Sequence, residues 1–463
     1  MRGFHREQAQ TLMPPGAPAS LWRSGLHTLA VSLASVVIGF GQSILIARVL
    51  GDPATKGGYD LTLATASLIS LVLGLSLPVG ATYVVARRRA NAGALAKWLL
   101  AWAALQGLVA LVVFLLIHDS AFGGALLPRT LGVWAIAPLV ILVAGTSAVA
   151  SLRNVLFGEQ RIVVANNGDL MGRAIVPLAM IAVALASVKL GPRYLPLAFL
   201  WCSALGMMVT SSRFLALLRN DLRSNSGAAG LREVLSFAIP AHVGNVVQFL
   251  NYRLDLFLVS ALIGLRAVGI YALAVSVAQL LWLISQSAAT VLLPRVASEA
   301  DTTPAAAAER SAQVARLTLW VTASAALFLA LFGQFLIPVV YGEKFRDSLQ
   351  PFLLLLPGIS GFSLAIVLAA HIAGAGRPSI NVVVAAVALV VTLILDLTLI
   401  PAIGVPGAAI ASSASYLTTA LVTAGVFSWM THVSPVRLVV PNAADLAVAR
   451  RFAASLRRRA TGS

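Results

Sequence analysis

The sequence predicts an all-α membrane protein of about twelve spanning helices in two six-helix lobes, and three observations predict it. Hydrophobic residues make up 59% of the 463 residues and charged residues only 11%, whereas soluble domains carry about 25% charged residues. Apolar runs of about 18 residues or more, the length needed to cross a bilayer, recur along the whole chain. A short motif also occurs twice, which is typical of a duplicated architecture.

The apolar runs divide the chain into twelve expected spans. They cover residues 26–48, 59–85, 95–117, 131–152, 170–189, 194–218, 233–261, 267–293, 314–340, 349–372, 379–400 and 405–430. Membrane β-barrels are excluded, because their strands alternate polar and apolar residues over about ten positions. No apolar segment leads to a cleavage site at the N-terminus, so we expect no removable signal peptide.

The distribution of Lys and Arg predicts the orientation. Twenty-four of these residues fall on the side of the membrane that carries both termini, and eight fall on the other side. Cytoplasmic loops carry the excess of positive charge, so both termini are expected in the cytoplasm of a multi-pass inner-membrane protein. The net charge of +17 is therefore accounted for by loops, and we expect membrane lipids rather than nucleic acid as partners.

The duplicated motif predicts the symmetry. An apolar-Gly pair, a short polar loop and Gly-x-Tyr precede a hydrophobic helix around Tyr59 and again around Tyr271. The offset is 271 − 59 = 212, and the pairs Gly191/Gly404 and Arg161/Arg377 give 213 and 216. Six spans per half is an even number, so the two lobes are expected to be related by a pseudo-two-fold axis along the membrane normal.

These boundaries divide the chain into five expected segments. They are a cytoplasmic N-terminal segment (1–25), an N-lobe (26–218), a cytoplasmic linker (219–232), a C-lobe (233–430) and a basic cytoplasmic tail (431–463). Apolar residues at helical spacing among the tail arginines predict an amphipathic helix on the anionic leaflet. A disordered basic tail is the alternative.

Enzyme signatures are missing from the sequence. It contains no phosphate-binding loop, no H-E-x-x-H zinc motif and no G-x-S-x-G nucleophile motif, and no stretch outside the spans is long enough for a catalytic domain. We therefore expect no enzyme activity, no cofactor and no metal site. A transporter of this composition would be driven by an ion gradient, the membrane potential or the gradient of its substrate.

The seventh span carries the clearest candidate site, because charges inside a membrane span are costly. Arg253 and Asp255 are two residues apart, about 200° around a helix, and cannot pair with each other. Arg253 shares a helix stripe with Asn245 and His242, and we interpret these three as substrate-binding. A guanidinium in a water-filled cavity can bind a diphosphate bidentately. Structural pairing of Arg253 with a carboxylate on another helix is the alternative.

Three further residues complete the candidate site. Arg48 ends the first span, where it would face the same cavity or lie at the membrane interface. Asp255 and Asp60 are candidates for coupling or gating, although Asp255 would also suit a structural ion pair. Asp60 near a helix N-terminus is favoured by the helix dipole in any case.

Two other sets of charges have simpler interpretations. Asp396 lies five residues before Pro401, so we expect it at the membrane interface. Asp169 and Arg173 are four residues apart on the same helix, a spacing that predicts a local salt bridge.

The motifs resemble those of a known family. The patterns around LGDPATKGGYDLTLA, LREVLSFAIPAHVGNVVQFLNYRLDLFLVSALIG, VGIYALA, LLPRVA, AGAGRP and LIPAIGVPGAAIASSAS are similar to those of Wzx-type lipid-linked oligosaccharide flippases. These are the polysaccharide biosynthesis exporters of the multidrug/oligosaccharidyl-lipid/polysaccharide exporter superfamily. The resemblance covers most of residues 25–430.

This resemblance implies two lobes around a partly cationic cavity with alternating access. The implied substrate is an oligosaccharide repeat unit of O-antigen, capsule or exopolysaccharide on undecaprenyl diphosphate, and the implied partners include a polysaccharide polymerase and chain-length proteins. Arg253 and Asp255 fall in the R-x-D stretch of the family. The family often has Asn where Asp396 stands, and lipid II flippases usually carry two further helices that this chain lacks.

Two other function classes fit the sequence less well. A cation-coupled multidrug exporter of the same superfamily is the alternative, but it needs acidic residues and the first span has none. A membrane glycosyltransferase or polymerase would need a large extramembrane loop with paired carboxylates, and the sequence contains none.

Overall fold

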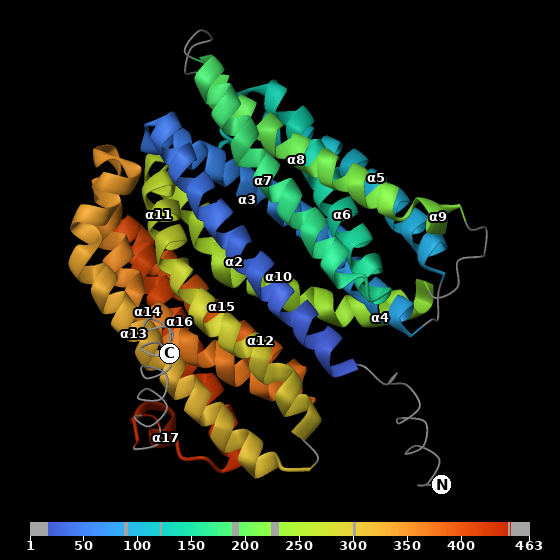
Figure 1. Cartoon of the computed structure of the whole chain (residues 1–463). Coiled ribbons are helices and arrows are strands. Elements are labelled where there is room, and N and C mark those ends of the chain that lie inside the picture. The colour runs from blue at the N-terminus through green and yellow to red at the C-terminus, as the bar shows by residue number, and fades with distance from the viewer. Residues whose placement is uncertain are drawn as a thin grey trace, which may run out of the picture. The chain divides into compact units, whose positions relative to one another are not determined.

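The chain is a multi-pass helical membrane protein. The computed structural model describes residues 17–87, 91–120, 123–187, 194–223, 231–299, 302–442 and 445. All regular structure in these ranges is helical (Figure 1), and twelve helices within them are long and apolar enough to cross a membrane. The all-α fold with twelve spans is therefore confirmed. Residues 1–16, half of the linker (224–230) and the tail region expected to form an amphipathic helix lie outside the described residues.

The helices follow the expected spans closely. Those of the first sequence half are α2 (Ala17–Leu50), α3 (Pro53–Gly74), α4 (Leu77–Ala86), α5 (Ala92–Asp119), α6 (Ile136–Gly158), α7 (Ile162–Ser187), α8 (Leu195–Leu217) and the short α9 (Arg219–Leu222). Those of the second half are α10 (Leu231–Leu262), α11 (Leu265–Ala278), α12 (Trp282–Glu299), α13 (Pro304–Tyr341), α14 (Leu349–Gly374), α15 (Pro378–Ile403), α16 (Val405–Thr431) and the short α17 (Val436–Val439).

Two expected spans are each built from two helices. The second span breaks between α3 and α4 at Leu75 and Ser76, which have φ angles of 48° and 52°. Pro78 follows at the start of α4 and disfavours a continuous helix through this point. The eighth span passes from α11 to α12 through a short 3₁₀ turn at Gln279–Leu281.

Packing divides the chain into two compact units. Unit 1 comprises Met1–Val49, Ile69–Leu116 and Leu131–His242, and unit 2 comprises Leu50–Leu68, Ile117–Thr130 and Val243–Ser463. Unit 2 thus includes segments from both halves of the sequence. The two lobes expected at 26–218 and 233–430 stay a prediction.

Unit 1 has its core between α4, α6 and α8, with α7 packed on α8. Small residues allow the last two helices to approach closely: a Cβ on Gly172 would lie 1.8 Å from the Thr210 Oγ1, and one on Gly168 would lie 2.3 Å from the Phe214 ring. Close packing through small residues is the common way in which helices associate in a membrane.

Unit 2 is centred on α14, which packs against α12, α13 and α16, while α15 packs on α16. A Cβ on Gly358 of α14 would lie 2.5 Å from the Ser413 Cα of α16. This packing holds α10, α11, α15 and α16 in place around the polar side chains of the candidate site.

The two copies of the duplicated motif pack against each other inside unit 2. A Cβ on Gly57 of α3 would lie 2.0 Å from the carbonyl oxygen of Leu265, and a Cβ on Gly269 of α11 would lie 1.9 Å from that of Pro53. Both pairs have the offset of the motif tyrosines, since 269 − 57 and 265 − 53 are each 212. The contact is therefore reciprocal, as in a local two-fold arrangement.

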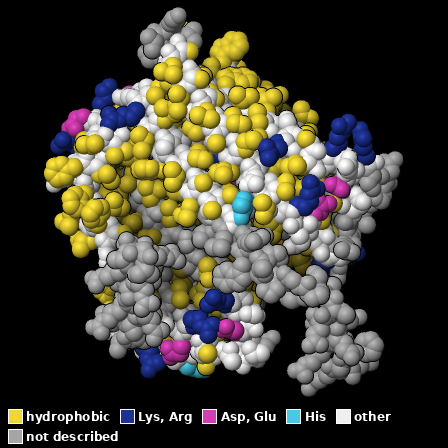
Figure 2. Space-filling view, viewed as in Figure 1, with side chains coloured by type: hydrophobic (Ala, Val, Ile, Leu, Met, Phe, Trp, Pro, Cys, Tyr) yellow, Lys and Arg dark blue, Asp and Glu magenta, His cyan; other side chains and the backbone are white. Residues whose placement is uncertain are grey.

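Large apolar side chains cover much of the described surface (Figure 2). Trp134, Leu185 and Leu421 expose 75%, 73% and 74% of their surface. Such extensive apolar exposure is unfavourable in water and indicates contact with lipid.

A buried ion pair fixes the chain that follows the last span. Asp445 accepts hydrogen bonds from Arg316 of α13, at 2.5 Å from Nε and 2.8 Å from Nη2, and both side chains are less than a tenth exposed. Leu438 of α17 is buried in the core formed by α12, α13, α14 and α16. The segment after α16 is thus attached to α13 by packing as well as by charge.

Candidate functional site

A buried carboxyl lies at the centre of a hydrogen-bond network in unit 2. Asp255 of α10 is only 2% exposed. Its Oδ2 accepts hydrogen bonds from the hydroxyl groups of Tyr271 on α11 and Ser412 on α16, the latter at 2.9 Å. Its Oδ1 accepts the backbone N–H of Leu256 at 2.7 Å. Three helices therefore hold this carboxyl in one orientation.

A second carboxyl is buried nearby. Asp396 of α15 is fully buried, and neither of its oxygens has a hydrogen-bond partner among the described residues. It interacts electrostatically with Asp255. The side chain of Asp396 faces the packed interior of the protein, and the membrane-interface position expected for it stays a prediction.

Two neighbouring carboxyls in a low-dielectric interior need a compensating positive charge, since an unpaired buried charge is costly. Within the described residues, no three His, Cys, Asp or Glu side chains form a metal-binding group. Two carboxylates with hydroxyl groups beside them suit a hard cation with oxygen ligands, or a proton, better than a transition metal. The pair can therefore change charge by binding and releasing a cation.

Arg253 lies on α10, two residues before Asp255. Its side chain is half-buried, and it interacts electrostatically with Asp255 and with Tyr416 of α16. Among the described residues it has no ion pair, as its spacing from Asp255 on one helix predicted. The guanidinium is therefore available to an anion.

The structure distributes the other predicted site residues between the units. Asn245 is exposed on α10 in unit 2. His242 and Arg48 belong to unit 1, where the His242 Nδ1 lies 3.4 Å from the Ser76 Oγ and Arg48 is exposed at the end of α2. That Arg253, Asn245, His242 and Arg48 form a single site stays a prediction.

Asp60 is part of a local ion pair. It accepts a hydrogen bond from Lys56, one turn earlier in α3, and Lys56 itself is buried. The preceding Asp52 accepts the backbone N–H of Thr55 at 2.9 Å at the start of the same helix. A gating role for Asp60 stays a prediction.

Sequence reasoning missed a basic cluster in unit 1. The expected salt bridge between Asp169 and Arg173 of α7 is confirmed at 3.0 Å, and Arg153 of α6 lies 3.4 Å from the same carboxylate. Arg213 of α8 contacts Met171 of α7. Arg153 and Arg173 share one carboxylate, so this group keeps an excess of one positive charge. The sequence shows the i, i+4 pair but not the approach of Arg153, which lies on another helix.

Comparisons with known proteins support the resemblance drawn from the motifs. The family model described as "Polysaccharide biosynthesis protein" matches residues 128–350. No curated protein matches the chain.

Several solved structures share the fold. The lipid II flippase MurJ, in its inward closed conformation, has a TM-score of 0.70 and 14% sequence identity, with 89% of this chain and 88% of MurJ covered. A multidrug resistance MATE family transporter of the MOP superfamily, in an inward-facing conformation, has a TM-score of 0.64 and 15% identity, with 89% and 99% covered. A MATE transporter from Vibrio cholerae has a TM-score of 0.58 and 12% identity, with 90% and 97% covered.

These findings confirm the resemblance: the chain is similar to the polysaccharide biosynthesis proteins over residues 128–350, and it has the fold of the MOP superfamily.

Proposed function

We propose that this protein is a transporter that flips an oligosaccharide linked to undecaprenyl diphosphate across the bacterial inner membrane. The observation that carries the proposal is the match to polysaccharide biosynthesis proteins on a fold shared with the lipid II flippase MurJ. The name of that neighbour describes a flippase for a lipid-linked substrate. The substrate proposed here has the same general chemistry, a long lipid, an anionic headgroup and a glycan.

Arginine side chains on predicted spans support a substrate with an anionic headgroup. Arg253 is half-buried and has no ion-pair partner among the described residues. Unit 1 carries a second positively charged group around Arg173, whose side chain is 53% exposed. Guanidinium groups on predicted spans suit a water-filled cavity rather than lipid, and their planar forks match phosphate oxygens.

The carboxyl pair supports coupling to a cation. Binding of Na⁺ or H⁺ between Asp255 and Asp396 would neutralise a costly buried charge, and release would restore it. Because Asp255 holds α10, α11 and α16 together through hydrogen bonds, its charge state is linked to the packing of these helices. A change of occupancy can therefore favour one arrangement of unit 2 over another.

The duplicated glycine contact supports alternating access. Gly57 and Gly269 join segments from the two halves of the sequence, at the ends of helices that the distribution of Lys and Arg predicts to be periplasmic. Such a contact would close the protein on that side and would separate when the substrate leaves. If both termini lie in the cytoplasm, this side of the protein faces the periplasm. The glycan would then leave the protein on the periplasmic side.

The alternative is a cation-coupled multidrug exporter of the same superfamily. The observation that favours it is the buried pair Asp255 and Asp396 on a fold shared with MATE transporters. The absence of acidic residues in the expected first span argues against it.

A complementation experiment separates these functions. The gene is expressed in a strain that lacks its own flippase, and surface glycan is measured for wild type, Arg253→Ala and Arg253→Lys at equal protein levels. We expect export by wild type, a loss of about 10-fold or more in the Ala variant, and partial activity in the Lys variant, which keeps the charge but not the bidentate fork. Drug resistance without glycan export would establish the alternative.

A further inference from the structure

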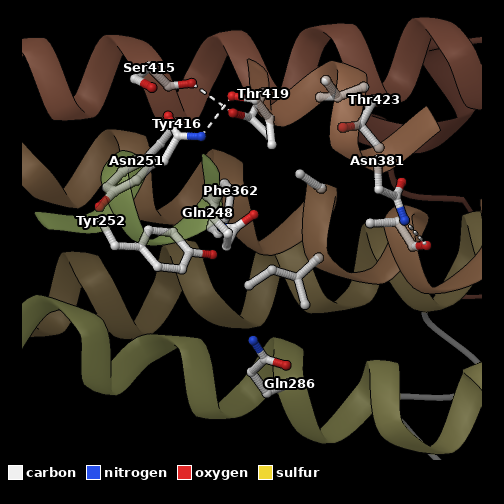
Figure 3. Close-up of a pocket in the computed structure, with 15 residues that line it drawn as sticks. Gln248, Asn251, Tyr252, Gln286, Phe362, Asn381, Ser415, Tyr416, Thr419 and Thr423 are labelled. Carbon is white, nitrogen blue, oxygen red and sulfur yellow. Dashed lines mark hydrogen bonds between the residues drawn. The ribbon is translucent and has the colours of Figure 1, made fainter. Parts of the chain in front are cut away.

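A cavity that the proposed mechanism does not use lies inside unit 2. It has a volume of 210 Å³ and lies between α10, α12, α14, α15 and α16 (Figure 3). At about 30 Å³ per molecule, this is room for roughly seven waters, which is the scale of a single sugar ring rather than of a longer glycan.

The lining of this cavity is mostly apolar, carries several amide and hydroxyl groups and has no charged side chain. None of its lining residues is Lys, Arg, His, Asp or Glu. Amide groups come from three helices, including Gln248 on α10, Gln286 on α12 and Asn381 on α15, and hydroxyl groups such as that of Thr419 come from α16. Amides and hydroxyls can both donate and accept hydrogen bonds, as a ligand rich in hydroxyl groups requires.

One buried acceptor in the wall has no partner. Asn251 is only 7% exposed, and its Nδ2 donates a hydrogen bond of 2.7 Å to the carbonyl oxygen of Ala385. Its Oδ1 has no partner among the described residues. This oxygen is itself shielded from the cavity, so Asn251 contributes to the site by fixing the wall through its bond to Ala385.

Aromatic side chains form another part of the wall. The rings of Tyr252, Phe362 and Tyr416 line the cavity, and Phe362 and Tyr416 lie 5.1 Å apart between ring centroids. Trp282 packs behind them, 5.0 Å from Tyr252 and 5.4 Å from Phe362. A sugar ring presents apolar C–H groups on its faces and hydroxyl groups on its rim, so it matches a wall that combines aromatic rings with amides.

We propose that this cavity binds one uncharged sugar unit of the transported glycan. The inference rests on the proposed function and adds a specificity to it. A neutral sugar can exchange hydrogen bonds with the amides of Gln248 and Gln286, whereas a uronic acid would bring a carboxylate into a cavity whose lining carries no cationic side chain. The headgroup and the glycan would therefore be recognised by different parts of the chain, the diphosphate by arginines and one sugar by this cavity.

Tryptophan fluorescence of the purified full-length protein tests the proposal, because Trp282 adjoins the cavity. The probes are N-acetylglucosamine and glucose as neutral sugars and glucuronic acid, which has the same ring as glucose, as the charged one. We expect a saturable change with at least one neutral sugar, absent in Trp282→Phe, and affinity at least about 10-fold lower for glucuronic acid.

Two variants locate the binding site. Gln286→Leu removes an amide of the lining, and Thr419→Val removes a hydroxyl group with little change in volume, so that it reports on the cavity even where the first variant folds poorly. Each is expected to lower sugar affinity about 10-fold. The matched control is Gln334→Leu, which removes an exposed amide of α13 and is expected to leave binding unchanged.

Three results would overturn the proposal: no saturable signal with either neutral sugar, glucuronic acid binding as tightly as these sugars, or wild-type affinity in both cavity variants. Flipping of the lipid-linked glycan is measured in parallel. A protein that flips its substrate but binds no neutral sugar would refute the cavity assignment alone. Failure to flip the substrate with intact sugar binding would refute the proposed function instead.

Discussion

Asp396 shows how a single side chain can favour function over stability. Its carboxyl is fully buried and has no hydrogen-bond partner among the described residues. Replacing it by an apolar side chain of similar size in Asp396→Leu should raise the free energy of unfolding by about 1–3 kcal/mol, because a buried polar group without a hydrogen-bond partner is removed. Thermal unfolding of the purified protein measures this effect, and a melting temperature below that of wild type would contradict it.

Asp255 is expected to behave in the opposite way. Asp255→Asn keeps the size of the side chain but weakens the acceptor for Tyr271 and Ser412, so the protein should lose about 1–2 kcal/mol of stability. Flipping driven by a Na⁺ or H⁺ gradient should fall at least about 10-fold in both variants, because each removes an ionisable group from the pair. Gradient-driven flipping at wild-type rate in both would exclude a coupling role.

The pair of Arg316 and Asp445 predicts a dependence on pH. Hydrogen bonds from Arg316 hold the pKa of the Asp445 carboxyl below its ordinary value of 3.8. A depressed pKa in the folded state means that the stabilisation is fully present above the ordinary value and is lost as the pH falls through the folded-state value. Asp445→Asn should therefore cost about 3 kcal/mol at pH 7, and the difference from wild type should shrink below about pH 4.

The melting temperatures of both proteins between pH 7 and pH 3 measure this dependence. Glu309→Gln is the control, because its ion pair with Arg437 is exposed and exposed pairs contribute about 0–1 kcal/mol. A constant difference between wild type and Asp445→Asn across this range would contradict the assignment.

The sequence identified some of these residues and missed others for physical reasons. Asp255 and Arg253 stand out because they interrupt an apolar span, which is costly. The burial of Asp396 was missed, because the sequence does not show which face of its helix packs against other helices. The contact of Arg153 with Asp169 was missed as well, because it joins two helices.

At the scale of helices, the glycine contact between α3 and α11 gives a sharp prediction. Gly269→Ala places a Cβ 1.9 Å from the Pro53 carbonyl oxygen, so the helices must move apart, at a cost of about 1–3 kcal/mol. The matched control is Gly425→Ala in α16, where a Cβ would meet nothing within 4 Å. Thermal unfolding compares the two, and equal melting temperatures would contradict the importance of the contact.

Helix existence was predictable from hydropathy alone, but helix breaks were not. The expected span at 59–85 contains an interruption at Leu75–Ser76 that its continuous apolar character conceals. The position of Pro78 was a usable signal, since proline is favoured in the first turn of a helix. The 3₁₀ turn at Gln279–Leu281 has no such signal in the sequence.

At the scale of the whole molecule, the predicted orientation can be tested by labelling. The single Cys202 is buried, so introduced cysteines can be labelled in an otherwise unreactive background. In intact cells, a membrane-impermeant maleimide should label Arg346→Cys, in a loop predicted to be periplasmic, and not Thr302→Cys, in a loop predicted to be cytoplasmic. The reverse pattern would invert the topology and the direction of transport.

The duplication was readable from the sequence because spacing survives when most side chains change. The sequence did not show that residues 50–68 and 117–130 belong to unit 2, because this depends on which backbone segments approach each other. Only the glycines of the motif carried a signal for that approach, and a glycine alone does not identify its partner.

The reciprocal glycine contact also has an evolutionary consequence. Each copy of the motif packs against the other. A substitution that enlarges a side chain in one copy would therefore disrupt the packing of both. A deep mutational scan of this chain should therefore show two bands of intolerance centred 212 positions apart, since 269 − 57 = 212. Second-site suppressors of a substitution in either band should arise in the other.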